Sequence, residues 1–194
     1  MGLAILVVGL VVFFASHLVV AAREKRAALI ERLGTNGYRA VFSVFSLVGL
    51  ALIVWGFAQY RAEGMIPVWS PPVWMRHVTV GLMLISVVLV VAAFIPSHIK
   101  TWAKHPMLAG IKTWAFAHLL VNGDLGSILL FGSFLAWAVY ARIAAKRRGD
   151  RGPQTAPAGW TNDILVVVIG VVVYLLLGFF FHPHVIGMRV FGPA

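Results

Sequence analysis

The run GLAILVVGLVVFFASHLVVAA, residues 2–22, is almost uniformly apolar, and its only polar side chains are Ser16 and His17 near its end. About 20 consecutive apolar residues form a helix long enough to cross the hydrocarbon core of a bilayer. No basic residue precedes the run, and three follow it within residues 23–26, which is not the pattern of a cleaved signal peptide. We therefore expect a retained first transmembrane helix.

The rest of the chain repeats this apolar pattern. Of the 194 residues, 61% are hydrophobic and only 11% are charged, which leaves too little polar surface for a soluble domain of this size. The sequence therefore predicts an all-α, polytopic integral membrane protein, a six-helix transmembrane bundle with a short fourth helix. Gly34–Gly37 should break the chain, and residues 143–162 should form a polar cytoplasmic loop rich in Gly and Pro. The expected helices span about Gly2–Ala22, Tyr38–Tyr60, Val73–Phe94, Pro106–Val121, Leu125–Arg142 and Asp163–Phe181.

The formal net charge is +10, a balance that in a soluble protein would indicate a nucleic-acid partner. Here the basic residues fall in the short connections between apolar runs, so the positive-inside rule explains them better. The lipid bilayer, and not nucleic acid, is the expected partner. The first, third and fifth connections carry most of the basic residues, so both termini should lie on the opposite, periplasmic side. The basic side holds Arg23, Lys25, Arg26, Arg32, Arg39, Lys100, Lys104, Arg142, Lys146, Arg147, Arg148 and Arg151, and the other side holds Arg61, Arg76 and Arg189.

The chain has no cysteine. This excludes thiolate ligands and covalent c-type haem attachment, so a bound metal would depend mainly on histidine. His17 and His118 lie within apolar helix bodies, where an uncompensated imidazole is costly and a functional site is the default hypothesis. His182 and His184, which flank a proline, form at most a weak surface metal site. The seven histidines are His17, His77, His98, His105, His118, His182 and His184.

Two explanations are open for His17 and His118. Either each imidazole hydrogen-bonds a neighbouring serine, carbonyl or water, or the two are axial ligands of a haem packed among the helices. The first and fourth helices run in opposite directions, and counting their rise leaves about 10 Å between the depths of the two residues. Bis-histidine ligation needs the two nitrogens about 4 Å apart. The alternative pairs are His105 with His17, and His118 with His77.

Polar residues around the fourth helix are candidates for supporting such a site. Lys112 could extend to the cytoplasmic interface or pair with a haem propionate. Asn122 and Asp124 are most simply a helix C-cap followed by an N-cap, although Asp124 could also orient a histidine or relay a proton. His77, beside Arg76, is more typical of an interfacial anchor than of a ligand.

Three segments of the chain resemble the bacterial NnrU family: RLGTNGYRAVFSVFSLVGL at 32–50, PPVWMRH at 71–77 and KHPMLAGIKTWAFAHLLVNGDLGSILLFGSFLAWAV at 104–139. The resemblance covers nearly the whole chain. It implies a single NnrU-type transmembrane domain over residues 1–194, located in the bacterial inner (plasma) membrane. The family takes its name from nitrite and nitric oxide reductase gene neighbourhoods, which implies a link to denitrification and a respiratory enzyme as a partner.

The NnrU family is also related to the plant and cyanobacterial 15-cis-zeta-carotene isomerase, an integral membrane enzyme with haem b. The spacing of the two histidines in KHPMLAGIKTWAFAH is similar to that enzyme's central block. The resemblance implies haem b in this chain, with His118 and His17 as iron ligands and His105 beside them. It further implies a redox-linked or isomerase-like role on a hydrophobic small molecule such as a polyene.

Two other functions are open. The chain could be a non-catalytic assembly or accessory factor, in which the histidines are structural. It could also be an S-adenosylmethionine-dependent membrane methyltransferase, because KHPMLAG at 104–110 resembles the RHP-type motif of isoprenylcysteine and phospholipid methyltransferases. Those enzymes also need acidic residues after their last membrane helices, and no acidic residue follows Asp163 here.

Overall fold

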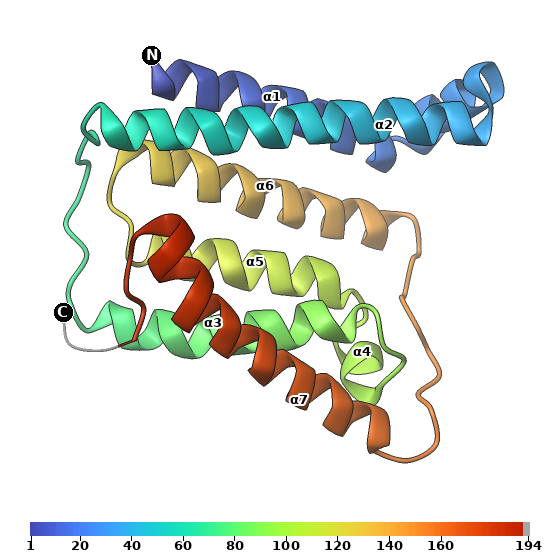
Figure 1. Cartoon of the computed structure of the whole chain (residues 1–194). Coiled ribbons are helices and arrows are strands. Elements are labelled where there is room, and N and C mark those ends of the chain that lie inside the picture. The colour runs from blue at the N-terminus through green and yellow to red at the C-terminus, as the bar shows by residue number, and fades with distance from the viewer. Residues whose placement is uncertain (192–194) are drawn as a thin grey trace. The chain divides into compact units, whose positions relative to one another are not determined.

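The computed structural model describes residues 1–191, and within them it is helical, with no strand (Figure 1). Seven of its helices are α-helices and the last is a π-helix. The elements are α1 (Gly2–Ala21), α2 (Arg23–Ala62), α3 (Met75–Ala92), α4 (His98–Ala103), α5 (Pro106–Leu119), α6 (Leu125–Arg147), α7 (Thr161–Leu176) and η1 (Leu177–Ile186). The all-α prediction is therefore confirmed for the described residues.

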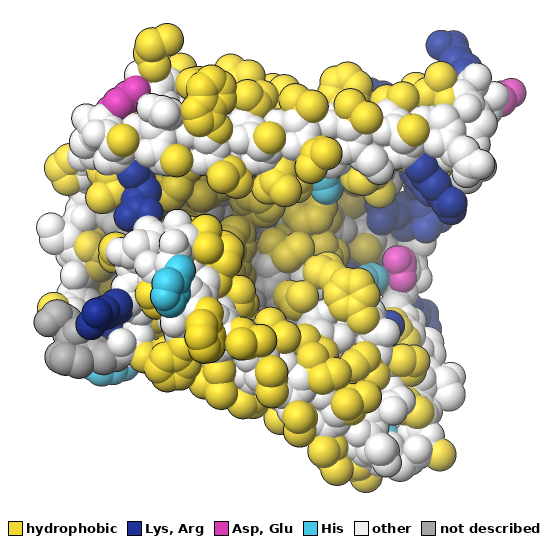
Figure 2. Space-filling view, in the orientation of Figure 1, with side chains coloured by type: hydrophobic (Ala, Val, Ile, Leu, Met, Phe, Trp, Pro, Cys, Tyr) yellow, Lys and Arg dark blue, Asp and Glu magenta, His cyan; other side chains and the backbone are white. Residues whose placement is uncertain are grey.

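Within residues 1–191, five helices are long and apolar enough to cross a membrane: α1, α2, α3, α6 and the continuous α7–η1 stretch Thr161–Ile186. Apolar side chains cover much of the visible helix surface (Figure 2), as expected for helices that face lipid. The expected fourth span is α5, and its 14 residues rise only about 21 Å, less than the hydrocarbon thickness. The structure thus supports a multi-pass membrane protein with a short α5, but the expected count of six spans is not established.

Two predicted connections contain helix. The expected break after the first span is a single residue, Gly34, whose φ of 70° and ψ of 164° interrupt α2 before the helix resumes. Glycine adopts this backbone at little cost, because it has no Cβ. The connection after α3 forms the short helix α4, in which the Ser97 hydroxyl accepts from the Lys100 N–H at 3.2 Å.

The described chain forms two compact units. The first comprises Met1–Ser70 with Gly123–Ser133, and the second comprises Pro71–Asn122 with the residues from Phe134 onward. Each unit has its own helix packing.

In the first unit, glycines allow α1 and α2 to pack backbone against backbone. A Cβ on Gly9 would lie 2.6 Å from the backbone nitrogen of Ile53, and one on Gly49 would lie 2.7 Å from that of Phe13. Small residues at helix crossings are the usual means of close packing in membranes, where van der Waals contact replaces the hydrophobic effect as the driving force. The antiparallel α1–α2 pair therefore depends on the absence of side chains at these positions.

In the second unit, α3 packs against α5 and α7 (Figure 1). The Ser86 hydroxyl donates to the Gly110 carbonyl at 2.8 Å, and a Cβ on Gly110 would lie 2.7 Å from the Val90 side chain. On the α7 side, the Tyr174 hydroxyl donates to the Val80 carbonyl at 3.1 Å. These interhelical bonds satisfy polar groups that have no access to water within a membrane.

The last helix extends beyond its predicted end. The sequence places that end at Phe181, because a proline follows, whereas η1 passes through Pro183 and ends at Ile186. In an α-helix Pro183 would clash with the carbonyl four residues earlier, and the wider i→i+5 turn of a π-helix relieves that crowding. Gly187, with a φ of 75°, then ends the helix, and its N–H donates to the His182 carbonyl.

Replacing Gly56 by alanine should destabilise the first unit, because the added Cβ would meet the Leu6 backbone of α1. Overpacking of this kind costs about 1–3 kcal/mol. Thermal unfolding of the detergent-purified protein should therefore begin at a lower temperature. Gly81→Ala is the matched control: no atom lies within 4 Å of its added Cβ, so it should be neutral or mildly stabilising. Equal midpoints for the two variants would contradict close α1–α2 packing.

Candidate functional site

His17 and His118, the two histidines expected in helix bodies, share one local arrangement. The Nδ1 atom of His17 lies 2.8 Å from the Phe13 carbonyl oxygen, and that of His118 lies 2.9 Å from the Trp114 carbonyl oxygen. A carbonyl oxygen only accepts, so Nδ1 must carry the hydrogen in both rings. In a neutral imidazole of this tautomer the lone pair is on Nε2.

Aromatic side chains surround both half-buried rings. His17 stacks on Phe13, with ring centroids 4.1 Å apart and planes at 24°. Trp114 lies 5.3 Å from the His118 ring and also contacts Phe134 edge-on at 5.3 Å. His17 belongs to the first unit and His118 to the second, so their pairing across one iron stays a prediction.

The second unit brings His182 to His118. Their ring centroids are 6.4 Å apart and their planes are inclined by 24°. The His182 Nδ1 atom donates to the Leu177 carbonyl at 2.9 Å, so this ring has the same tautomer as His118. Sequence reasoning missed this pair because it ended the last helix before His182; the apolar pair Val185-Ile186 was the only sign that the helix continues.

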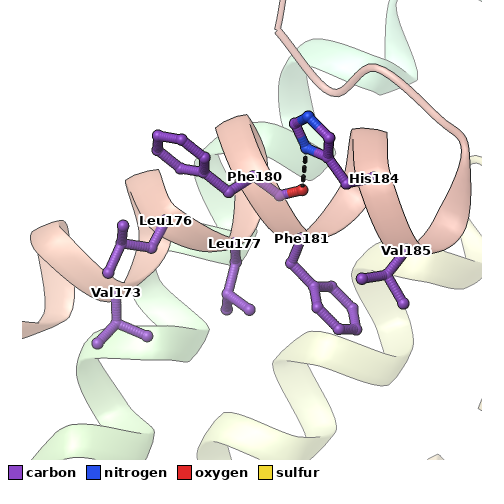
Figure 3. A pocket seen from close by; sticks show the side chains of 7 residues that line it. All are labelled: Val173, Leu176, Leu177, Phe180, Phe181, His184 and Val185. Atoms are coloured by element: carbon purple, nitrogen blue, oxygen red, sulfur yellow. Dashed lines mark hydrogen bonds between the residues drawn. The ribbon is translucent and has the colours of Figure 1, made fainter.

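His184 has a different environment. Its exposed ring donates from Nδ1 to the Phe180 carbonyl at 2.8 Å and lines an otherwise apolar surface depression of about 480 Å³ on α7–η1 (Figure 3). The rings of His182 and His184 are held by separate carbonyls. Residues two apart on a helix do not face each other, so this arrangement gives no support to a metal site shared by His182 and His184.

His105 and His77, the remaining candidate ligands, differ from the pair above. His105 precedes α5, and its Nε2 atom lies 3.2 Å from the Asp150 carbonyl oxygen, so the atom best placed for a metal is already donating. The His77 side chain is exposed, and the structure gives its ring no hydrogen bond, ion pair or ring contact within residues 1–191. Neither ring shares the arrangement of His118 and His182.

The polar residues expected to support the site lie at the end of α5, at the start of α6 and on the side of α5. The Asn122 side chain donates to the His118 carbonyl at 2.8 Å, which caps α5 as expected. The Asp124 carboxylate accepts from the Ser127 N–H at 2.9 Å, the expected N-cap of α6. Lys112 is half-buried and borders a second depression of about 370 Å³ with apolar neighbours such as Phe116. The suggested roles of Lys112 with a propionate and of Asp124 in proton relay stay predictions.

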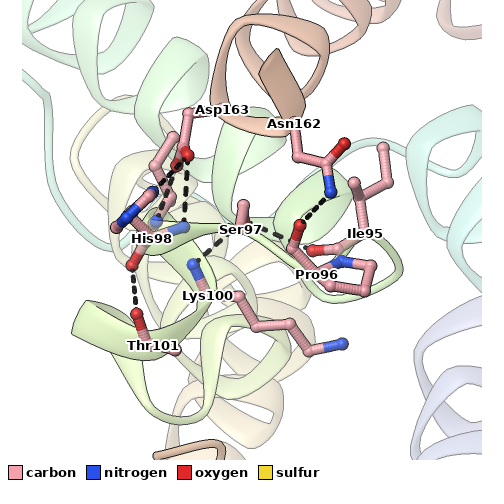
Figure 4. Close-up of polar contacts among 9 residues, drawn as sticks. Ile95, Pro96, Ser97, His98, Lys100, Thr101, Asn162 and Asp163 are labelled. Carbon is pink, nitrogen blue, oxygen red and sulfur yellow. Dashed lines mark hydrogen bonds and ion pairs between the residues drawn. The ribbon is translucent and has the colours of Figure 1, made fainter. Parts of the chain in front are cut away.

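A polar cluster that sequence reasoning missed joins the start of α4 to the start of α7 (Figure 4). The buried Asp163 carboxylate accepts from the His98 N–H at 3.2 Å, the His98 Nδ1 at 2.8 Å and the Ile99 N–H at 2.9 Å. The His98 ring also stacks on Trp160 at 4.2 Å. Because both carboxylate oxygens accept hydrogen bonds from α4, we interpret this cluster as a structural clamp. Ser97, a preferred N-cap residue, was the available signal for α4.

Together, the long apolar helices define a multi-pass helical membrane protein, with histidine side chains bonded to carbonyls of their own helices. A family model described as NnrU protein matches residues 5–190, nearly the whole chain. The chain therefore belongs to the NnrU family, and the resemblance seen in its sequence is confirmed. No curated protein and no solved structure matches the chain.

Replacing Thr79 by valine should loosen the end of α5 that carries His118. The buried Thr79 hydroxyl donates at 3.0 Å to the Ala117 carbonyl, in the last turn, where helical carbonyls lack intrahelical donors. Interhelical hydrogen bonds in membranes contribute about 0.6 kcal/mol on average. The unfolding midpoint in detergent should fall slightly. The control is Thr113→Val, which loses only a bond to the Ala109 carbonyl in its own helix, so its unfolding midpoint should fall less. A larger fall for Thr113→Val than for Thr79→Val would contradict the interhelical role of Thr79.

Replacing Asp163 by asparagine should weaken the α4–α7 clamp, because a neutral amide cannot match a carboxylate that accepts three N–H groups. Losing hydrogen bonds to a charged group costs about 1.5–3 kcal/mol. Limited proteolysis should then cut residues 148–160 faster than in the parent. The control is Glu31→Gln on the exposed part of α2, which should leave the cleavage rate unchanged. Unchanged cleavage in both variants would argue against the clamp.

Proposed function

We propose that this protein binds haem b in the bacterial inner membrane, with His118 as an axial ligand, and that its role is redox-linked. The observation that carries the proposal is the state of the His118 imidazole. It is half-buried in an apolar helix, and its Nδ1 hydrogen is bonded to the Trp114 carbonyl, which makes Nε2 the nitrogen that carries the lone pair. Imidazole nitrogen is a standard axial ligand of haem iron.

The available donors suit haem better than a bare metal ion. Residues 1–191 contain no cluster of three or more His, Cys, Asp or Glu side chains that could hold an ion. A haem brings four equatorial nitrogens of its own and needs only one or two ligands from the protein. The Trp114 ring beside His118, and the Phe134 ring that contacts Trp114, are also the kind of apolar surface on which a macrocycle packs.

The sequence supplies the rest of the proposal. His17, with its Nδ1 bonded to the Phe13 carbonyl, has the same ligand-ready form and is the opposite ligand that the family resemblance implies. Lys112 would pair with a propionate. Haem iron supplies one-electron chemistry, and the protein holds and orients it. The role would be isomerase-like chemistry on a hydrophobic molecule, or an accessory role in nitrite and nitric oxide respiration, with both termini in the periplasm.

An absorption spectrum of the protein purified from haem-replete cells tests this proposal. We expect a Soret band, a pyridine haemochrome of the b type and low-spin ferric iron. His118→Ala should lose most of the haem or become high-spin, whereas His77→Ala, which changes an exposed ring without a partner within residues 1–191, should keep the parent spectrum. A colourless parent protein would contradict haem binding and favour a non-catalytic assembly factor.

A further inference from the structure

We propose that one end of the second unit is a docking surface for anionic phospholipids of the surrounding bilayer. This basic surface is formed by Lys104, Lys146, Arg147 and Arg151. All four side chains are exposed, and none of them has a hydrogen bond, an ion pair or a ring contact with another residue in the range 1–191. The proposal is independent of the haem site, because it concerns the headgroup layer and not the interior of the helices.

The way in which α6 ends keeps its last basic residues at the surface. The Gly149 N–H donates to the Lys146 carbonyl at 3.0 Å, and the Asp150 N–H donates to the Ala145 carbonyl at 3.0 Å. With Gly149 at a φ of 71°, these bonds form a Schellman motif, in which a left-handed glycine ends the helix and redirects the chain. Lys146 and Arg147 therefore stay exposed in the last turn of α6.

The chain after this turn is fastened to the α4–α5 junction. The His105 Nε2 atom donates to the Asp150 carbonyl at 3.2 Å, and Gly152 lies so close to the Lys104 carbonyl that an added Cβ would collide with it. Because Arg151 lies between Asp150 and Gly152, these two contacts bring its backbone beside Lys104. Segments that are distant in the sequence thus place their positive charges at one end of the unit.

The backbone of Lys104 supports a functional need for its charge. Lys104 is the C-cap of α4, with a φ of 60° and a ψ of −49°, and within residues 1–191 it is the only non-glycine residue with a positive φ. Glycine would adopt this conformation more easily. Strained backbone of this kind persists where surrounding contacts hold it, and it is concentrated at ligand-binding and functional sites. A lysine here combines a strained backbone with an exposed, unpaired ammonium group.

Two tryptophans place the basic surface at the depth of lipid headgroups. Trp102 of α4 and Trp160, the N-cap of α7, are both exposed, and their ring centroids are 5.8 Å apart. Tryptophan is enriched at membrane–water interfaces, because its ring is apolar and its N–H can reach water. Trp102 is only two residues from Lys104. The charges of this surface are therefore expected at the level of phosphate groups.

The acidic residues of the second unit do not neutralise the basic surface. They are Asp150 and Asp163. The Asp163 carboxylate is buried and accepts from α4, and the Asp150 carboxylate accepts from the Gly152 N–H at 3.0 Å and lies 3.8 Å from the His105 Nε2 atom. An excess of positive charge remains. Each Lys or Arg close to an anionic membrane surface strengthens binding about fivefold.

A phospholipid fits this place better than a soluble anion does. Beyond Trp160, α7 presents exposed apolar side chains such as Ile164 and Leu165, along which acyl chains can lie. A soluble phosphate would gain only from the charges, and these are screened by salt at an exposed site. A lipid anchored in the bilayer gains from both the charges and the apolar helix. The committed occupant is therefore a bilayer phospholipid with a net negative headgroup.

Native mass spectrometry of the detergent-purified full-length protein tests the proposal with phosphatidylglycerol and phosphatidylcholine of identical acyl chains. The parent should bind phosphatidylglycerol more tightly. Arg151→Gln should weaken that binding about fivefold and Lys104→Gln/Arg151→Gln about 25-fold, while phosphatidylcholine binding stays unchanged. The control, Arg189→Gln, removes an exposed arginine of the same unit from the opposite terminus of the last helix and should keep the parent affinity.

Equal binding of the two lipids by the parent, or equal losses in Arg151→Gln and Arg189→Gln, would overturn the proposal. Glycerol phosphate, which lacks acyl chains, should not displace phosphatidylglycerol at millimolar concentration. Displacement would show a site for soluble anions and would overturn the assignment to lipid.

A second variant tests the arrangement without changing any charge. Gly152→Ala should push the loop away from Lys104, because the added Cβ would meet the Lys104 carbonyl, and phosphatidylglycerol affinity should fall. The matched control is Gly159→Ala in the same connection: its φ of 77° is similarly unfavourable for alanine, but nothing lies within 4 Å of the added Cβ. Equal phosphatidylglycerol affinities in these two variants, at unchanged helix content by circular dichroism, would contradict a surface assembled from both segments.

Discussion

The hydrogen bond from a histidine Nδ1 to a carbonyl of the same helix is the interaction on which the proposed site depends. In hydrocarbon no water competes for a polar group, so each imidazole must find its partner inside the protein. His17, His118, His182 and His184 all do so through a backbone carbonyl. The bond removes the cost of burying one nitrogen and, by the same act, leaves the other as a pure acceptor. Burial in a membrane therefore favours the Nδ1-protonated tautomer, in which Nε2 carries the lone pair that a metal would bind.

The short helix α5 illustrates how a helix shorter than the hydrocarbon thickness can be accommodated. Its last carbonyls would be costly without donors in an apolar environment. Thr79 of α3 donates to the Ala117 carbonyl, and Asn122 donates to that of His118. Nearer the start of α5, Gly110 lets the α3 backbone approach closely. The end of α5 is satisfied by neighbouring protein groups, so the helix can end within its unit with His118 in the last turn.

Sequence reasoning succeeded where composition and local pattern decide the outcome. Continuous apolar runs predict helices because no other segment satisfies its backbone in a membrane, and α1 and α3 follow from this within a few residues. The N-cap Asp124 and the break at Gly34 likewise follow from local chemistry. Family membership was readable from the long central block, and the match over residues 5–190 confirms it.

The errors arose where a tertiary contact overrides a local signal. Pro183 is a strong helix terminator in isolation, yet η1 continues through it, because the tail around Phe191 packs back on the helix and a wider turn accommodates the proline. Because of that single misreading, the contact between the His182 and His118 rings was not foreseen. Depth describes only the position of a residue along the helix axis. The direction in which its ring points also depends on the rotation of the residue about that axis. Rotation around the axis is set here by a π-turn that no periodicity in the sequence encodes.

The described depressions bear on what such a site could recognise. The depression beside Lys112 is otherwise apolar apart from Thr113, and the Thr113 hydroxyl already donates to its own helix. The one on α7–η1 offers only His184 as a polar group, and that ring is held by the Phe180 carbonyl. Surfaces of this kind select by shape and apolar contact and discriminate poorly between molecules of similar size. Selective recognition at either depression would therefore depend on the shape of the bound molecule rather than on a polar group.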